Sequence, residues 1–447
     1  NLTNNGTLNF NSGSGRVCNL TFKGNGNKSF TGSNGAATTV LNLLTIDKGN
    51  SQTPSLTLDV AGTLTAPSNN WLTLSNGTFL LAKATTLSLT NAALTSYTIP
   101  STAALSVNNA GAIVNIGMFA DDSNDLFLGG KLEISAGTVN IGNLINNNNN
   151  DIEYVAASTP AIILTGGNLN VNGQIRRSTT VTTGFLSYSQ SGSSALLIRG
   201  KNQIATRAKF EIVNTSSVFN MSGSSTITIE RGGGTTFSDV YIDPSSNAVT
   251  GGTIIFNSTG TAANQTYNLD SNIPLFNVTV TGNVGETSTC RLPVSELNLK
   301  GSLLISNVSS VFNTNSRNVT IFGNFTNLNT TVSTGLNVGG YRPISATQTT
   351  FFKGATSNQT ITGVAGNLTN FGNLVIENIF LAGTVTVAPN TNLRVNNILT
   401  LNEGTFATGL NTITTVGNIY NQSLHTSVGI GAIVMSVPAH HAYGLSS

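Results

Sequence analysis

Residues 56–60 read Leu-Thr-Leu-Asp-Val, with an apolar side chain at every second position. The same alternation returns along the chain in short runs that stop at Gly or Asn and then start again. The next runs are Leu72-Thr73-Leu74, Leu87-Ser88-Leu89, Leu105-Ser106-Val107, Val114-Asn115-Ile116, Leu132-Glu133-Ile134 and Val139-Asn140-Ile141. A period of two indicates a β-strand with one buried face. Each run offers only two or three inward side chains, so a stable core requires many such strands to be stacked.

The composition supports an all-β repeat protein. Only 8% of the 447 residues are charged and the net charge is +2, which gives no field to gather nucleic acid or an anionic membrane. Strong helix formers are scarce, whereas Asn, Gly, Thr and Val favour turns and strands. We predict a right-handed parallel β-helix (β-solenoid) that forms an elongated rod with almost no helix. A coil of ~22 residues would give roughly 20 coils.

A longer repeat is superimposed on the alternation. Phe22-Lys23-Gly24 leads to Leu44-Thr45-Ile46, as Phe352-Lys353-Gly354 leads through Gln359-Thr360-Ile361 to Leu374-Val375-Ile376. The unit in 352–401 resembles the repeat regions of Bacteroidota cell-surface β-helical proteins, which are cargo of type IX secretion and include gliding and attachment adhesins. The resemblance implies an extracellular, cell-surface location. It also implies the type IX secretion machinery and outer-membrane anchoring components as partners.

The alternation continues through the whole chain but changes in regularity. Residues 1–205 are expected to form solenoid coils, with a less regular and decorated part from about 118. Residues 206–424 are expected to continue the same array. The pattern is lost in 425–447, which we interpret as a cap or the entry to a further domain. No stretch is long and apolar enough to span a membrane.

A basic stretch is the most prominent polar feature. Arg176, Arg177, Arg199 and Lys201, with Arg207 and Lys209 nearby, face few acidic residues in the sequence. If several share one face, they would bind an anionic surface glycan or another surface protein. Two aromatic residues, Trp71 and Tyr188, would stack on sugar rings. The alternative is that the basic residues lie on different coils and solubilise the rod, while the aromatic residues belong to the core.

Asp121, Asp122 and Asp125 form the main acidic cluster of the sequence. Their oxygen atoms suit a structural Ca²⁺ ion, although the spacing is not that of an EF-hand, and the alternative is a solvated loop. Paired carboxylates also hydrolyse glycosides. The Gly-His-Gly and Arg-x-Lys elements expected of pectin-degrading β-helix enzymes are missing, so we assign no catalytic residue and no cofactor beyond this Ca²⁺.

Two residue types carry structural expectations. Asn residues at equivalent turns of successive coils are expected to stack into hydrogen-bonded ladders. The two cysteines, Cys18 and Cys290, are too few for a disulfide framework and are expected to be buried free thiols.

The sequence favours a structural and adhesive role on the outside of a cell, in which a rigid repeat rod presents a binding surface or acts as a stalk. One alternative is a β-helical carbohydrate-active enzyme, either a polysaccharide lyase or a glycoside hydrolase. The other alternative is a passive surface-layer or filament element that binds no ligand.

Overall fold

The computed structural model describes residues 1–13, 15–117, 126–143, 149–155, 158–200, 206–233, 238–258, 264–283, 285–380, 383–429, 431–436 and 442–443. Strands make up 54% of the described residues and stack in parallel as a β-solenoid of about 14 turns. The predicted all-β solenoid is therefore confirmed. These residues form no helix, and so none that is long and apolar enough to cross a bilayer.

The chain divides into two compact units. The first contains Asn1–Thr228 together with Tyr241–Ala248, and the second contains Ile229–Gly233, Ser238–Val240 and the chain from Val249 onward. The chain passes from the first unit to the second within 229–249. This change lies C-terminal to residue 205, the position at which the sequence pattern suggested a division.

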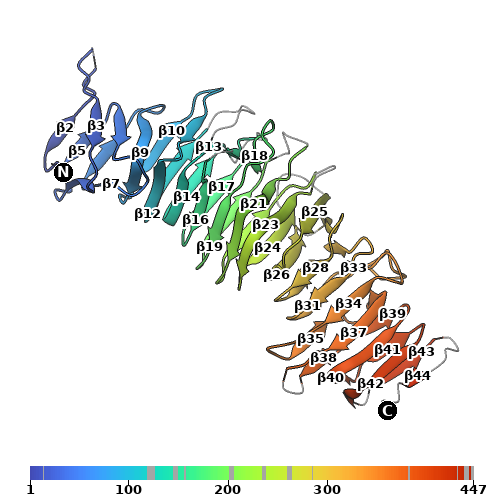
Figure 1. The fold of residues 1–447 in the computed structure, drawn as a ribbon. Helices are drawn as coiled ribbons and strands as arrows, with labels where there is room; N and C mark the ends of the chain where they lie inside the picture. The colour runs from blue at the N-terminus through green and yellow to red at the C-terminus, as the bar shows by residue number, and fades with distance from the viewer. Residues whose placement is uncertain are drawn as a thin grey trace. The chain divides into compact units, whose positions relative to one another are not determined.

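The strand pairings divide the strands of the first unit into three columns of parallel strands. Figure 1 shows the strands of successive coils stacked side by side. The first column holds β1 (Leu2–Thr3), β4 (Lys28–Gly32), β7 (Ser55–Val60), β9 (Leu72–Leu81), β12 (Ala103–Ile116), β14 (Lys131–Ile141), β16 (Ala161–Leu164), β19 (Ser187–Gln190) and β21 (Phe210–Met221). The second holds β10 (Thr86–Thr90), β12, β14, β17 (Asn168–Val171), β20 (Ala195–Ile198) and β22 (Thr226–Ile229). The third holds β11 (Tyr97–Ile99), β13 (Leu126–Leu128), β15 (Ile152–Tyr154), β18 (Ile175–Arg177) and the start of β21, beside which β23 (Val240–Val249) lies.

The N-terminal coils complete their three columns with further short strands. One column contains β3 (Leu20–Lys23), β6 (Leu44–Asp47) and the start of β9, and the other contains β2 (Thr7–Asn9), β5 (Thr38–Val40) and β8 (Thr63–Thr65).

The core of the first unit is a stack of equivalent apolar residues. In the first column these are Leu56, Phe79, Leu105, Leu132, Ile162, Tyr188 and Phe219, each at most 1% exposed. Full burial of one such apolar side chain contributes roughly 1.5–3 kcal/mol. Successive members lie 23 to 31 residues apart. The assumed coil of ~22 residues was therefore too short, because the corners and loops between the strands lengthen most coils.

The corner inside β14 shows why the turns need glycine. Gly137 joins the halves of β14 that enter two different columns, and its φ is +82°. A Cβ atom at this position would lie 2.5 Å from the carbonyl oxygen of Asn109 and 2.6 Å from that of Ala112. A side chain is thus excluded both by the left-handed backbone and by the preceding coil.

Asparagine ladders join successive coils, but the ladder described here lies on strands and not at the turns for which it was predicted. Asn140 Nδ2 donates to Asn115 Oδ1 at 2.8 Å, and Asn170 Nδ2 donates to Asn140 Oδ1 at the same distance. The three residues occupy paired positions on β12, β14 and β17. Neutral amides on the outer face of the strands therefore bond to each other from coil to coil.

The second unit is built in the same way. One column contains β24 (Thr253–Ser258), β26 (Asn277–Gly282), β29 (Leu303–Ile305), β32 (Phe325–Asn327), β35 (Gln359–Thr362), β38 (Thr384–Val387) and β40 (Leu399–Gly409). Another contains β28 (Leu297–Leu299), β31 (Val319–Ile321), β34 (Thr349–Phe352), β37 (Asn373–Glu377), β40, β42 (Ile419–Gly429) and β44 (Ala442–Tyr443). The remaining strands are β25 (Gln265–Ser271), β27 (Ser288–Arg291), β30 (Val311–Asn313) and β33 (Tyr341–Arg342), followed by β36 (Leu368–Phe371), β39 (Asn392–Val395), β41 (Thr412–Thr415) and β43 (Ala432–Met435).

Aromatic side chains fill the core of the second unit. Phe352 is fully buried, as the repeat predicted, and its ring meets those of Phe325 and Phe371 edge-on at 6.2 and 6.3 Å. Phe325 also packs edge-on against Tyr341 at 5.2 Å. The parallel pairing continues through β42, β43 and β44, within the segment for which a cap was expected.

The two thiols differ in accessibility, which corrects one expectation. Both are free, but Cys18 is exposed and Cys290 is buried in β27. Cys18 follows the excursion 11–17, whose ends meet in an antiparallel bridge between Asn11 and Val17, outside the stacked strands.

This difference predicts selective labelling. A maleimide should modify one thiol of the folded chain, Cys18, because burial both shields Cys290 and raises the pKa of its thiol. Mass spectrometry after digestion should find the label at Cys18 alone, and at both residues after denaturation in guanidinium. Labelling of Cys290 in the folded chain of a Cys18→Ser variant would contradict the burial.

Candidate functional site

A cluster of charged side chains is buried between successive coils in the third column of the first unit. Arg176 on β18 is 1% exposed and lies opposite Glu153 on β15. Its Nε donates to Asp151 Oδ2 at 2.8 Å, and its Nη1 donates to Glu153 Oε2 at 2.7 Å. A buried guanidinium is stable only when charges of the opposite sign and hydrogen bonds compensate it, and this pairing supplies both.

The next residue is held by a different acid. Arg177 Nη2 donates to Glu211 Oε1 at 2.7 Å, and the Arg177 backbone N–H donates to Glu211 Oε2 at 3.1 Å. Glu211 is fully buried at the start of β21. Burial works to lower the pKa of Arg177, but the hydrogen bond and the charge of Glu211 outweigh it and raise that pKa. Arg177 is therefore a fixed cation that is already neutralised by Glu211.

Asp151 makes the stability of this cluster depend on pH. Burial raises the pKa of its carboxyl to about 6 from an ordinary 3.8, although the charge of Arg176 opposes the change. The folded chain then binds a proton more readily than the unfolded chain between these two values. The contribution of Asp151 to stability is complete below pH 3.8 and is lost as the pH rises through about 6.

Lowering the pH from about 7.5 to about 4.5 should therefore stabilise the wild type by about 2 kcal/mol relative to Asp151→Asn, which cannot titrate. Urea unfolding of both proteins at several pH values measures this difference, and parallel curves would contradict it.

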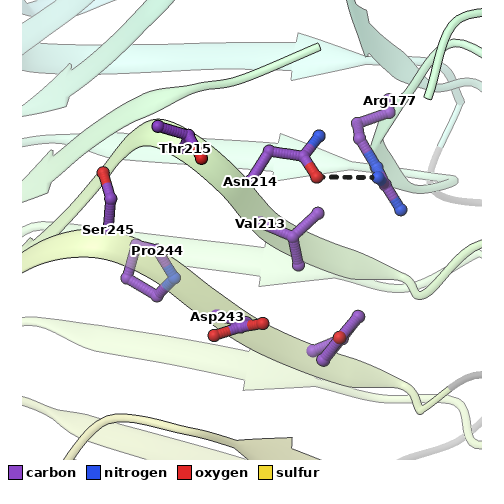
Figure 2. Close-up of a pocket in the computed structure, with 8 residues that line it drawn as sticks. Arg177, Val213, Asn214, Thr215, Asp243, Pro244 and Ser245 are labelled. Atoms are coloured by element: carbon purple, nitrogen blue, oxygen red, sulfur yellow. Dashed lines mark hydrogen bonds between the residues drawn. The ribbon is translucent and has the colours of Figure 1, made fainter. Parts of the chain in front are cut away.

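Beside this cluster, two neighbouring strands form an open polar groove of about 340 Å³ (Figure 2). Val213, Asn214 and Thr215 line it from β21, and Tyr241, Asp243, Pro244 and Ser245 line it from β23. Arg177 completes the lining from the end of β18. All eight residues belong to the first unit.

The floor of the groove is held in one conformation by hydrogen bonds. Asn214 has a left-handed backbone with φ of 84°, and Ser216 has φ of 78°. The Asn214 amide donates to the carbonyl oxygens of Thr182 and Gly184 at 2.7 Å each and accepts from Arg177 Nη1 at 3.3 Å. The Ser216 N–H donates to Ser245 Oγ at 2.9 Å, which ties β21 to β23. A non-glycine backbone in this region persists only where its surroundings fix it, so the groove is formed before any ligand arrives.

On β23 the alternation of the strand places Tyr241 and Asp243 in the lining of the groove. Ile242 is buried, whereas Tyr241 and Asp243 on either side of it are half-buried. Among the described residues no hydrogen bond or ion pair involves the Asp243 carboxylate. The groove therefore offers a carboxylate acceptor beside an aromatic ring.

The predicted basic face differs from the arrangement in the structure. Arg176 and Arg177 are buried and paired with Asp151, Glu153 and Glu211, so they do not present free positive charge to a glycan. Arg199 is half-buried beside β20, and Lys201 lies outside the described residues. Of the nearby basic residues, Lys209 is also buried and donates from Nζ to the carbonyl oxygen of Gly200 at 2.7 Å.

The two aromatic residues proposed to stack on sugars lie in the core. Trp71 is fully buried, and its Nε1 donates to the carbonyl oxygen of Ser88 at 2.8 Å. Tyr188 is fully buried, its ring stacks on Phe219 at 5.7 Å, and its hydroxyl donates to Gln190 Oε1. Both residues therefore follow the alternative interpretation, in which they belong to the core.

The calcium hypothesis concerns residues that the structure does not describe. Asp121, Asp122 and Asp125 all lie outside the described residues. Within the described ranges, no group of three or more His, Cys, Asp or Glu side chains is arranged to hold a metal ion.

Sequence reasoning missed Tyr241, Asp243 and Asn214, although one signal was available. Val240-Tyr241-Ile242-Asp243 has the same alternation as the core strands, which places Tyr241 and Asp243 together on the face opposite Ile242. Tyr241 and Asp243 lie beside Asn214 only because the backbone of β21 bends there, and no local sequence pattern predicts that bend.

The chain matches no family model, no curated protein and no solved structure.

Proposed function

We propose that this chain is an extracellular, cell-surface protein with a structural and adhesive role, in which a stack of rigid coils carries a preformed binding groove. The observation that carries the proposal is the groove between β21 and β23, where a Tyr241 ring and an Asp243 carboxylate, for which the described residues supply no partner, lie on a floor fixed by Asn214. Small-ligand sites are typically preformed hollows with a few fixed polar groups, and this groove has that character.

The exterior of the coils suits this role. Neutral amides such as those of Asn115, Asn140 and Asn170 pair with each other, so solubility rests on uncharged hydrogen-bonding groups. Attachment through such groups does not depend on charge and should persist in salt. The resemblance of the 352–401 repeat to Bacteroidota surface proteins supports export by type IX secretion, anchoring at the outer membrane, and a part in adhesion or gliding.

A binding role fits the groove better than hydrolysis. Asp243 is the one carboxylate among the eight lining residues, and the neighbouring Glu211 is buried and engaged by Arg177. Glycoside hydrolysis needs two carboxyl groups that flank the same bond.

Attachment of the purified, fluorescently labelled chain to polysaccharide-coated surfaces and to fixed bacterial cells tests the proposal. We expect saturable attachment that unlabelled chain displaces and that changes little between about 0.05 and 0.5 M NaCl. Absence of saturable attachment to every surface would favour a passive stalk. Release of new reducing ends or unsaturated sugars from the polysaccharides would favour the enzyme.

A further inference from the structure

We infer that the groove between β21 and β23 binds a neutral sugar residue, with the Asp243 carboxylate accepting hydrogen bonds from adjacent sugar hydroxyls and the Tyr241 ring covering the apolar face of the sugar. This inference rests on the proposed adhesive function and names the ligand class for its site.

The charge of the groove favours a neutral ligand over an anionic one. Arg177 is the one cation among the lining residues, and its guanidinium already bonds to Glu211 at 2.7 Å, to the Thr182 carbonyl oxygen at 2.8 Å and to Asn214 at 3.3 Å. Asp243 adds a negative charge for which the described residues supply no partner. A uronate or sulfate would bring a second anion beside this carboxylate, whereas a neutral sugar brings only hydroxyl donors.

The spacing of the two strand residues fits a sugar ring. Tyr241 and Asp243 are two positions apart on β23 and therefore point to the same side, about 7 Å from each other along the strand. A carboxylate has two oxygens that can accept two donors at once, as adjacent equatorial hydroxyls provide. An aromatic ring contributes apolar contact area with little loss of conformational entropy.

The remaining lining groups limit the size of the ligand. The volume of about 340 Å³ lies at the lower end of ligand sites, with room for one or two sugar residues of a longer chain. Thr215 and Ser245 line the same groove and are exposed, so their hydroxyls lie where neighbouring sugar residues would extend. The Ser245 hydroxyl is already oriented by the Ser216 N–H and by the Ser217 carbonyl oxygen.

Saturation-transfer NMR and calorimetry with chitotetraose and cellotetraose as neutral probes, and tetragalacturonate as the anionic probe, test the inference on the full chain. We expect at least one neutral probe to bind and the anionic probe to bind at least about tenfold more weakly. Asp243→Asn and Tyr241→Ala should each weaken neutral binding about tenfold, whereas Tyr241→Phe should stay within about threefold because the ring remains.

Matched substitutions elsewhere control for general effects. Asp59→Asn replaces an exposed strand aspartate in β7, and Tyr420→Ala replaces a half-buried tyrosine in β42, and neither should change binding. Hydrogen exchange of β21 and β23 in each groove variant shows whether the site still folds. Tighter binding of the uronate, or neutral binding that both groove variants leave unchanged, would overturn the inference.

The surface-attachment assay separates this inference from the broader function. Attachment that survives Asp243→Asn and Tyr241→Ala would overturn the groove as the sugar site and leave the adhesive role intact. Failure of the wild type both to attach to surfaces and to bind any probe would overturn both.

Discussion

Replacing Arg176 with methionine is expected to lower the free energy of unfolding of the coils around β15 and β18 by about 3–5 kcal/mol. The substitution keeps most of the side-chain volume but removes the charge that Asp151 and Glu153 share at 2.8 and 2.7 Å. The loss is large because Asp151 is fully buried and would be left as an uncompensated anion or take up a proton. Native-state hydrogen exchange of the β15 and β18 amides measures the effect in the coils concerned.

Two controls distinguish loss of the ion pairs from loss of a long side chain. Arg16→Met changes an exposed arginine near the N-terminus and should alter stability by less than about 0.5 kcal/mol. Adding Asp151→Asn and Glu153→Gln to Arg176→Met should restore part of the lost stability, since the stranded charges are then removed as well. A stability loss below about 1 kcal/mol for Arg176→Met would show that the cluster is not the buried network described above.

Replacing Phe352 with alanine is expected to destabilise the second unit by about 3–5 kcal/mol. The ring is fully buried between Phe325 and Phe371, and neighbouring coils cannot close the cavity without breaking their register with β31 and β37. Urea unfolding followed by circular dichroism, with hydrogen exchange of β34, measures the loss.

The preceding residue provides a matched control within the same strand. Phe351 is half-buried on the other face of β34, where Lys353 Nζ lies 5.3 Å from the centre of its ring. Phe351→Ala should cost about 1–2 kcal/mol, less than Phe352→Ala, because it removes only a half-buried ring and its contact with Lys353. Equal losses for the two substitutions would mean that the assigned faces of β34 are incorrect.

The sequence predicted the fold because one short-range rule governs every coil. Alternation at Leu132-Glu133-Ile134 and Val139-Asn140-Ile141 determines which side chains face inward, and stacking is the only way for such short strands to build a core. The assignment of Phe352 to the interior followed from the same rule. The length of a coil did not, because it depends on loops whose residues carry no periodic signal.

The site was harder to predict because its residues come from separate coils. Arg176 and Arg177 look like a solvent-exposed basic pair in the sequence, yet their partners Glu153 and Glu211 lie 23 and 34 residues away. Which acid lies beside which base depends on coil length, the quantity that the sequence left undetermined. The groove likewise depends on the bend at Asn214 and Ser216, which the alternation of β21 does not reveal.

The direction of the bonds between coils has a mechanical consequence. In each unit the strands pair in parallel with the coil before and the coil after, so these hydrogen bonds point along the stack. A pull on the chain ends therefore peels the outermost strand bond by bond, and does not shear all its bonds together. Each coil that detaches would increase the extended length of the chain. For the 28 residues from Phe30 to Leu58, the increase would be about 3.4 Å per residue. Single-molecule stretching should show a series of low-force steps of unequal length, so that the protein absorbs a sudden load by yielding one coil at a time.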